Sequence, residues 1–259
     1  MLVAITREVS PAIGRCELTF ADRLPIDYPR ACAQHRAYEQ ALKRLGCELL
    51  TLPPADDLPD CVFIEDTAVV LDELAVITRP GAASRRPERV TTALALNDHR
   101  RLETIETPGT LDGGDVLRIG RTLWVGTAGR SNWAGIGQLR AIVAEFGYDV
   151  RPVELRDCLH LKSAVTQVAA ETLLVNPAWV DPHVFGVPRL VCVDETEPHA
   201  ANVLRVGPSL LMPAAFPRTR ARLEAQGLTV VAVDVSELQK AEGAVTCCSL
   251  IFESPDEAA

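Results

Sequence analysis

The sequence has no long run of apolar residues. Its first segment, 1–5, is apolar for only five residues before the polar stretch Thr6–Glu8, which is too short for the hydrophobic region of a signal peptide. Elsewhere no apolar stretch approaches the roughly eighteen residues that a membrane-spanning helix needs. We therefore expect no membrane partner and no secretory route, and we predict a cytoplasmic protein.

Basic charge is also scarce. The chain has 26 basic and 35 acidic residues and a formal net charge of −9, and only Lys43, Lys162 and Lys240 are lysines. A protein that binds nucleic acid non-specifically usually carries a basic face. The charge balance therefore predicts no nucleic-acid partner.

Cysteine pairs of the CxxC type are missing, although the chain has eight cysteines. The cysteines are scattered between positions 16 and 248 and are not gathered in the small module typical of a disulfide framework or a structural zinc site. We expect reduced thiols and no bound metal.

Short β-like segments alternate with amphipathic helix-like segments, which is typical of an α/β protein. The predicted strands are 2–6, 61–71, 74–78, 116–119, 122–126, 164–169, 172–176, 203–206, 209–213 and 245–253. The predicted helices are 28–45, 87–102, 133–146 and 217–226. The acidic segment 253–259 is expected to fray.

An internal repeat organises these segments. In each unit a polar or reactive residue precedes a strand, and these markers are Asp66, Asp112, His160, Asn202 and Cys247, with gaps of 46, 48, 42 and 45 residues. Five such units account for almost the whole chain. The repeat predicts one α/β domain, 1–259, in which five strand–helix units surround an axis and bring their markers together.

Two adjacent carboxylates, Glu65 and Asp66, interrupt an apolar run that begins at Cys61. Burying an ionised carboxylate costs several kcal/mol unless a partner compensates it, and the run contains no lysine or arginine. The partner would be another segment or a cationic ligand. The alternative is a pair that faces solvent at the end of a strand.

Three further markers could form a nucleophilic site. Neighbouring cysteines in a strand point to opposite faces, so at most one of Cys247 and Cys248 can serve a given site. A nucleophilic thiol needs a base or a cationic neighbour, which His160 could provide, and Asp112 could orient the imidazole. Taken singly, each has a plainer interpretation: a turn for Asp112, a structural histidine and buried apolar cysteines.

As a set, these segments resemble the dimethylarginine dimethylaminohydrolase family of the guanidine-modifying (amidinotransferase/deiminase) superfamily. The resemblance rests, in family order, on segments 58–70, 77–86, 111–117, 125–132, 159–163 and 246–249. It implies a five-bladed α/β propeller without metal or organic cofactor. It also implies hydrolysis of Nω-methylated arginine to citrulline and a methylamine, at a C–N bond of the guanidinium, through a covalent cysteine thiouronium.

The resemblance also implies roles for individual residues. Cys247 matches the nucleophile, His160 the general acid and base, and Asp112 the acid that orients the histidine. The residues that match substrate contacts are Leu18, Asp60, Phe63, Glu65, Asp66, Arg85, Arg130 and Ala241. Without the resemblance, Arg85 reads as part of a solvated charge run at a helix start.

Two other functions remain open at this stage. One is an arginine deiminase or another enzyme of the same superfamily, although paired Arg85 and Arg130 favour a substrate with a free α-carboxylate over agmatine. The other is a non-catalytic propeller that binds a macromolecule, as the ribosome anti-association factor of similar fold does. A small propeller could also form a homodimer through an outer face.

Overall fold

Five three-stranded sheets form the fold of the computed structural model, which describes residues 1–254. In every sheet the first strand runs antiparallel to the middle strand, and the last strand runs parallel to it. The first strands are β15 (Leu250–Glu253), β3 (Ala68–Val70), β6 (Val116–Ile119), β9 (Val165–Ala169) and β12 (Leu204–Val206). The middle strands are β1 (Leu2–Arg7), β4 (Leu74–Ile77), β7 (Thr122–Gly126), β10 (Thr172–Val175) and β13 (Ser209–Pro213). The last strands are β2 (Cys47–Leu52), β5 (Arg101–Thr104), β8 (Asp149–Val153), β11 (Arg189–Cys192) and β14 (Thr229–Val233).

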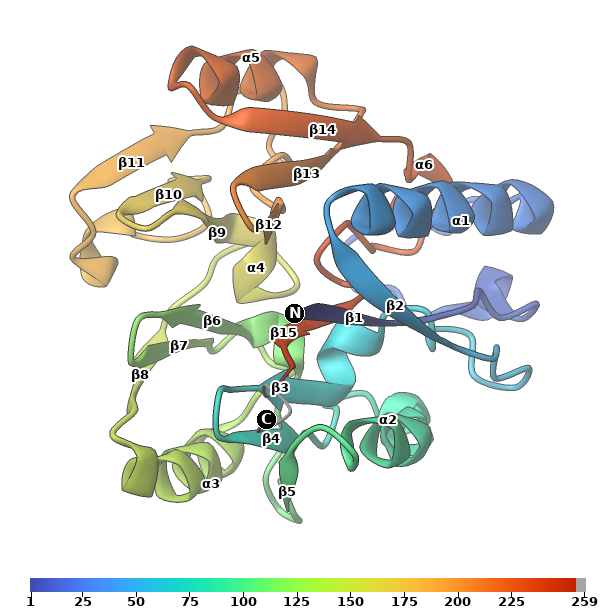
Figure 1. Ribbon diagram of the computed structural model, residues 1–259, viewed down its shortest axis with the longest axis vertical. Coiled ribbons are helices and arrows are strands. Elements are labelled where there is room, and N and C mark those ends of the chain that lie inside the picture. Colours follow the sequence, from blue (N-terminus) through green and yellow to red (C-terminus); the bar gives the residue numbers. More distant parts are fainter. Residues whose placement is uncertain (255–259) are drawn as a thin grey trace.

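The sheets are arranged around a common centre, with the longer helices at the periphery (Figure 1). These helices are α1 (Tyr28–Arg44), α2 (Arg89–Leu96), α3 (Trp133–Val143) and α5 (Pro217–Ala225). Helix α1 begins where the Asp27 side chain accepts a hydrogen bond from the Arg30 amide, and α3 begins with the same device at Asn132. The short helices α4 (Leu161–Ala164) and α6 (Ser236–Gln239) follow His160 and Val235.

The two ends of the chain meet in one sheet. Strand β15 pairs antiparallel with β1, from Leu2 opposite Glu253 to Ile5 opposite Leu250, so the last segment completes the first unit. This arrangement confirms the predicted five-unit α/β propeller. Of the acidic segment that was expected to fray, residues 255–259 lie outside the described range.

The core consists of clusters of buried apolar side chains between sheets and helices. In one of them Tyr38 and Leu42 of α1 pack with Val245 and Cys248, next to the marker Cys247. The Tyr38 hydroxyl also donates to the Val245 carbonyl at 2.9 Å. Helix α1 therefore braces the segment that carries Cys247.

Several predicted boundaries are wrong. Segment 61–71 forms a 3₁₀ helix at Ile64–Thr67 before β3, because the Thr67 hydroxyl bonds back to the Ile64 carbonyl at 2.7 Å. Segment 245–249 forms a turn before β15, where the Thr246 amide donates to Asn202 Oδ1 at 3.0 Å. The helix predicted over 87–102 ends at Leu96.

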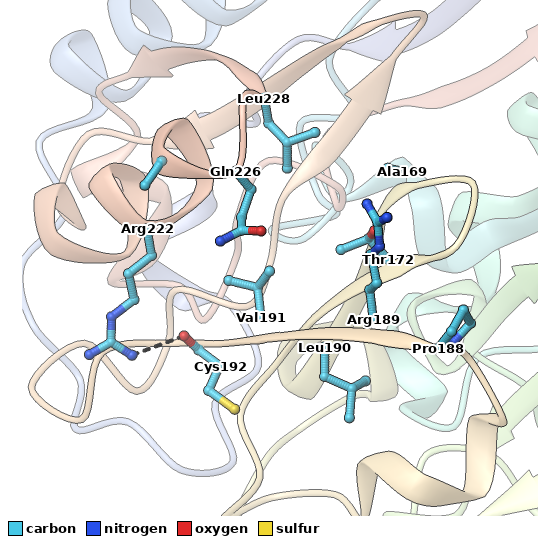
Figure 2. A pocket seen from close by; sticks show the side chains of 11 residues that line it. Ala169, Thr172, Pro188, Arg189, Leu190, Val191, Cys192, Arg222, Gln226 and Leu228 are labelled. Carbon is cyan, nitrogen blue, oxygen red and sulfur yellow. Dashed lines mark hydrogen bonds between the residues drawn. The ribbon is translucent and has the colours of Figure 1, made fainter.

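The fourth unit has only a 3₁₀ helix, Pro182–Phe185, where the other units have a longer helix between middle and last strands. A hollow of about 730 Å³ lies between its strand β11 and helix α5 (Figure 2). Arg222 of α5 spans it by donating to the Cys192 carbonyl at 3.1 Å. None of the site residues expected from the sequence lines this hollow.

Within residues 1–254, no helix combines the length and the apolar character that crossing a membrane requires.

Candidate active site

The five repeat markers come just before the first strands of the five sheets. Asp66 precedes β3, Asp112 precedes β6, His160 precedes β9, Asn202 precedes β12 and Cys247 precedes β15. Three of the markers line a small cavity of about 20 Å³, and the full lining is Glu17, Asp60, Phe63, Asp66, Arg85, Arg130, Leu159, His160, Ala241, Glu242, Gly243 and Cys247. Among the residues expected to form the site, Leu18, Glu65 and Asp112 are not part of this lining.

His160 and Asp112 form a buried pair. His160 Nε2 lies 3.0 Å from Asp112 Oδ2, and the two residues are 5% and 0% exposed. On the other side of the ring, Nδ1 lies 3.9 Å from Asp66 Oδ1. Burial lowers the pKa of His160, but the charge of Asp66 and the hydrogen bond to Asp112 raise it more, to about 9. The imidazole is therefore protonated at neutral pH.

Asp115, which the sequence analysis did not single out, ties these two residues together. Its carboxylate accepts from the Ser131 hydroxyl at 2.6 Å and from the Leu161 amide, next to His160, at 3.2 Å. The Ser131 hydroxyl in turn accepts from the amide of Asp112 at 3.1 Å. Burial raises the pKa of Asp115 to about 7, despite the nearby His160. In the sequence, Asp115 closes a short Asp-Gly-Gly-Asp motif, 112–115, and this second aspartate is the signal that could have indicated its role.

The two glycines of that motif allow a close approach of backbones. A Cβ added at Gly114 would lie 2.7 Å from Asp66 Oδ1 and 2.8 Å from His160 Nδ1, and one at Gly113 would overlap the Glu65 carbonyl. The Gly114 amide instead donates to Asp66 at 2.9 Å. Glycine is required here because any side chain would displace the site residues.

Asp66 is paired with Arg85, whose Nη1 lies 2.5 Å from Asp66 Oδ2. Arg85 is only 4% exposed, and it also donates to Glu88 at 2.9 Å and to the Phe63 carbonyl at 3.0 Å. The interpretation of Arg85 as a solvated residue is thus wrong. Burial raises the pKa of Asp66, but the charges of His160 and Arg85 lower it more, to about 2. Asp66 stays ionised across the physiological range.

Glu65 supports the turn that carries the thiol. Its Oε1 lies 2.5 Å from Lys162 Nζ, and its Oε2 accepts from the Thr246 hydroxyl at 2.7 Å. Asn202 holds the same threonine through a bond to its hydroxyl at 3.0 Å. Sequence reasoning missed Lys162 and Thr246 as site residues, and Asn202 was found only as a marker of the repeat.

The two neighbouring cysteines differ in environment. Cys247 lines the cavity, whereas Cys248 is 0% exposed, packs in the core and donates to the Ala244 carbonyl at 3.3 Å. Only Cys247 faces the cavity, and the two cysteines lie in a turn and not in the predicted strand. Burial and the charges of Glu65 and Asp66 raise the pKa of Cys247 to about 12. Without a bound cation, Cys247 is therefore a thiol.

The rim of the cavity carries the remaining expected residues. The Asp60 carboxylate accepts from the Glu17 amide at 3.1 and 3.2 Å, and Arg130 donates to the Thr19 hydroxyl at 3.0 Å. A Cβ at Gly243 would overlap the ring of Phe63. Ala241 is buried in the lining, and Leu18 packs against the core cluster that contains α1.

One trio in the described part of the chain has a geometry that could hold a metal ion. Asp66, Asp112 and His160 each offer one ligand atom, all within 4.8 Å of one another. An ion would have to compete there with Arg85 for Asp66 and with the hydrogen bond between His160 and Asp112.

The fold and the site together define a five-bladed α/β propeller with a cysteine, a histidine and carboxylates converging at its centre. The chain is 43% identical to an N(G),N(G)-dimethylarginine dimethylaminohydrolase of Streptomyces coelicolor, covering 95% of both chains. It is 36% identical to the enzyme of that name from Pseudomonas aeruginosa, covering 87% of this chain and 90% of the other. The chain belongs to the dimethylarginine dimethylaminohydrolase family.

Solved structures agree in fold. A Pseudomonas aeruginosa family member complexed with citrulline is 33% identical, with a TM-score of 0.90 over 96% of this chain and 98% of that one. A cyanobacterial arginine dihydrolase domain bound to its substrate is 20% identical, with a TM-score of 0.86 over 98% and 99% of the two chains. No protein-family model matches the chain.

Proposed function

We propose that this protein hydrolyses Nω-methylated arginine to citrulline and a methylamine. The observation that carries the proposal is the convergence of Cys247, His160 and Asp66 on one cavity, in a chain of the dimethylarginine dimethylaminohydrolase family. A guanidinium is a planar cation, and its carbon is a poor electrophile until its charge is held and polarised. In this proposal Asp66 accepts N–H bonds from the guanidinium, and Phe63 lies along the substrate.

Substrate binding would activate the thiol. The pKa of Cys247 is raised to about 12 by burial and by the carboxylates of Glu65 and Asp66. A bound guanidinium offsets the negative charge of these carboxylates, which lowers that pKa and releases the thiol proton to solvent. The thiolate then attacks the guanidinium carbon and forms a tetrahedral adduct.

His160 would serve as acid and then as base. Protonated His160 donates its proton to the departing methylamine as the C–N bond breaks, which leaves a thiouronium on Cys247. The neutral histidine then takes a proton from water, whose oxygen attacks the same carbon and releases citrulline. In this scheme Asp112 holds the ring and stabilises its charged form.

The amino-acid end of the substrate would be recognised by charged groups of the cavity lining. Asp60 offers a carboxylate to the α-ammonium group, and Arg85 and Arg130 offer guanidinium groups to the α-carboxylate. The backbone near Leu18 and Ala241 completes this end. Glu65, with both oxygens engaged by Lys162 and Thr246, contributes its negative charge from behind the thiol, and its direct contact with substrate stays a prediction.

The test is citrulline formation from asymmetric dimethylarginine, monomethylarginine and arginine at equal concentration. The proposal predicts that at least one methylated substrate turns over faster than arginine. Faster turnover of arginine would instead assign the chain an arginine deiminase activity, and no turnover of any guanidine would contradict the hydrolase proposal.

Three further expectations belong to this proposal. The chain acts as one catalytic domain, it works in the cytoplasm, and it could pair as a homodimer through an outer face. Light scattering of the purified protein tests the last of these directly.

A further inference from the structure

The cavity that holds Cys247 is too small for the proposed substrate. Its volume of about 20 Å³ corresponds to about one water molecule. Part of its wall is Glu17, at the start of segment 17–27, which contains no helix or strand and is largely exposed. Glu17 is exposed, whereas the other lining residues are buried or partly buried. Segment 17–27 is therefore the part of the wall that can move to admit a substrate.

The Glu242 carboxylate fastens the first part of this segment. Glu242 Oε1 accepts from the amides of Phe20 and Ala21, both at 2.6 Å, and Glu242 Oε2 accepts from the amide of Thr19 at 2.9 Å. Three consecutive N–H groups directed at one ionised acceptor form a charge-assisted anion cradle. Outside this cradle, Lys240 donates to the Pro25 carbonyl at 3.0 Å and Glu237 accepts from the Asp27 amide at 2.9 Å.

The position of Glu242 links the segment to the site. Its backbone has φ of 58°, a left-handed conformation that residues other than glycine rarely adopt. Both its neighbours, Ala241 and Gly243, line the cavity, and Cys247 follows five residues later. The segment that Glu242 holds also contacts two rim residues, through the Glu17 amide on Asp60 and the Thr19 hydroxyl on Arg130.

We propose that Glu242 is a latch that holds segment 17–27 closed over the cavity, and thereby a positioning residue for the amino-acid end of the substrate. The second half of this inference rests on the proposed function, because it takes Asp60 and Arg130 as the groups that recognise that end. When Glu242 no longer holds the segment, the segment moves away, and its contacts to Asp60 and Arg130 are broken. Glu242 forms no hydrogen bond with Cys247 or His160, and His160 is held by Asp112, so the reacting groups keep their geometry.

Limited trypsin digestion of the full chain tests closure without reference to activity. Arg23 lies inside segment 17–27 and its guanidinium is tied to the carbonyls of Gly14 and Cys16. Cleavage after Arg23, identified by fragment mass, should be about tenfold faster or more in Glu242→Ala, because the rate follows the open population. Glu242→Gln, which keeps the shape but loses the charge, should fall between. Glu224→Ala, on the exposed face of α5, should match the parent protein.

Kinetics tests the positioning role. Glu242→Ala should raise KM for methylarginine about tenfold while kcat stays within about twofold. The reason is that the lost contacts bind the substrate equally in the ground state and in the transition state. KM for a methylguanidine without the α-groups should not change. Unchanged cleavage after Arg23 would overturn the latch. Faster cleavage with unchanged KM for methylarginine would overturn the positioning role and leave the proposed function standing, and an inactive parent protein would refute the function without affecting the digestion result.

Discussion

Arg85 and Arg130 both line the cavity, but their surroundings are opposite. Arg85 is buried on the floor of the site, where Asp66, Glu88 and the Phe63 carbonyl accept its hydrogen bonds. Arg130 lies at the rim, is partly exposed and donates to a single hydroxyl, that of Thr19 on the covering segment.

The same difference holds for the carboxylates. On the floor, Asp66 accepts from the Gly114 amide, Asp112 is hydrogen-bonded to His160, and Asp115 accepts from the Ser131 hydroxyl and the Leu161 amide. Buried partners thus fix the orientation of all three carboxylates. Asp60 at the rim is engaged by a backbone amide of the covering segment. The floor is thus preorganised for charge, whereas the contacts of the rim can be exchanged for a ligand.

The largest expected effect is the loss of turnover in Cys247→Ser. A serine hydroxyl at this position has no nearby base strong enough to ionise it, so citrulline formation should become undetectable while the far-ultraviolet circular dichroism stays unchanged. Cys248→Ser is the matched control, and it should keep most of the activity. If Cys247→Ser were active, or if Cys248→Ser folded but were inactive, the nucleophile would not be Cys247.

Asp112→Asn should lower kcat by about 10²- to 10⁴-fold, the range for loss of an oriented acid–base group. It should also shift the pH profile. The folded pKa of His160 is raised to about 9, so the proton-donating form is present at neutral pH and is lost as the pH rises through that value. Removing the hydrogen bond of Asp112 lowers this pKa, so the alkaline limb of kcat should move to lower pH. If the alkaline limb stayed at the same pH, Asp112 would not be a cause of the raised pKa of His160.

Arg85→Ala should destabilise the protein, because it leaves Asp66 and Glu88 as buried carboxylates without their partner. Removing one partner of a buried ion pair costs about 3–5 kcal/mol, which should appear in the free energy of unfolding by urea. Glu88, whose pKa burial raises to about 7 despite Arg85, should take up a proton in this variant. A change of less than about 1 kcal/mol, the value typical of an exposed pair, would place Arg85 with the rim residues.

Arg130→Ala should have the smallest effect on stability and a selective effect on binding. The free energy of unfolding should change by less than about 0.5 kcal/mol, as for an ordinary surface substitution. KM for methylarginine should rise about tenfold, as expected for loss of one charge-assisted contact, and KM for a methylguanidine without the carboxylate should not. Equal changes for both substrates would remove Arg130 from carboxylate recognition.

The spacing of the markers predicts much of this architecture. Five polar residues in the same phase of a repeat predicted that segments far apart in sequence would meet, and the first and middle strands of the third to fifth units lie close to their predicted positions. None of the five last strands was predicted. Two of them, β5 and β11, are short and partly exposed, so they carry no clear apolar period. The repeat pattern also gives no sign that the fourth unit lacks the longer helix that the other units have between their middle and last strands.

The contacts among the buried charged residues of the floor could not be predicted in the same way. The pairing of Glu65 with Lys162 joins residues 97 positions apart, and the bond from Arg85 to Asp66 depends on how a 3₁₀ segment folds over the site. A local charge pattern such as Arg85–Arg86 looks solvated until tertiary packing buries one of the two. The Glu242 contacts are equally invisible in sequence, since their acceptors and donors are more than 220 residues apart.

The central claim, a covalent intermediate on Cys247, is tested most directly by mass spectrometry of His160→Ala with S-methylthiocitrulline. The thiolate that leaves this substrate analogue needs no proton from the histidine, whereas the water that clears the intermediate does need a base. We predict that an adduct equal to the analogue less methanethiol accumulates on the peptide that contains Cys247. No adduct, or an adduct on Cys248, would contradict the account.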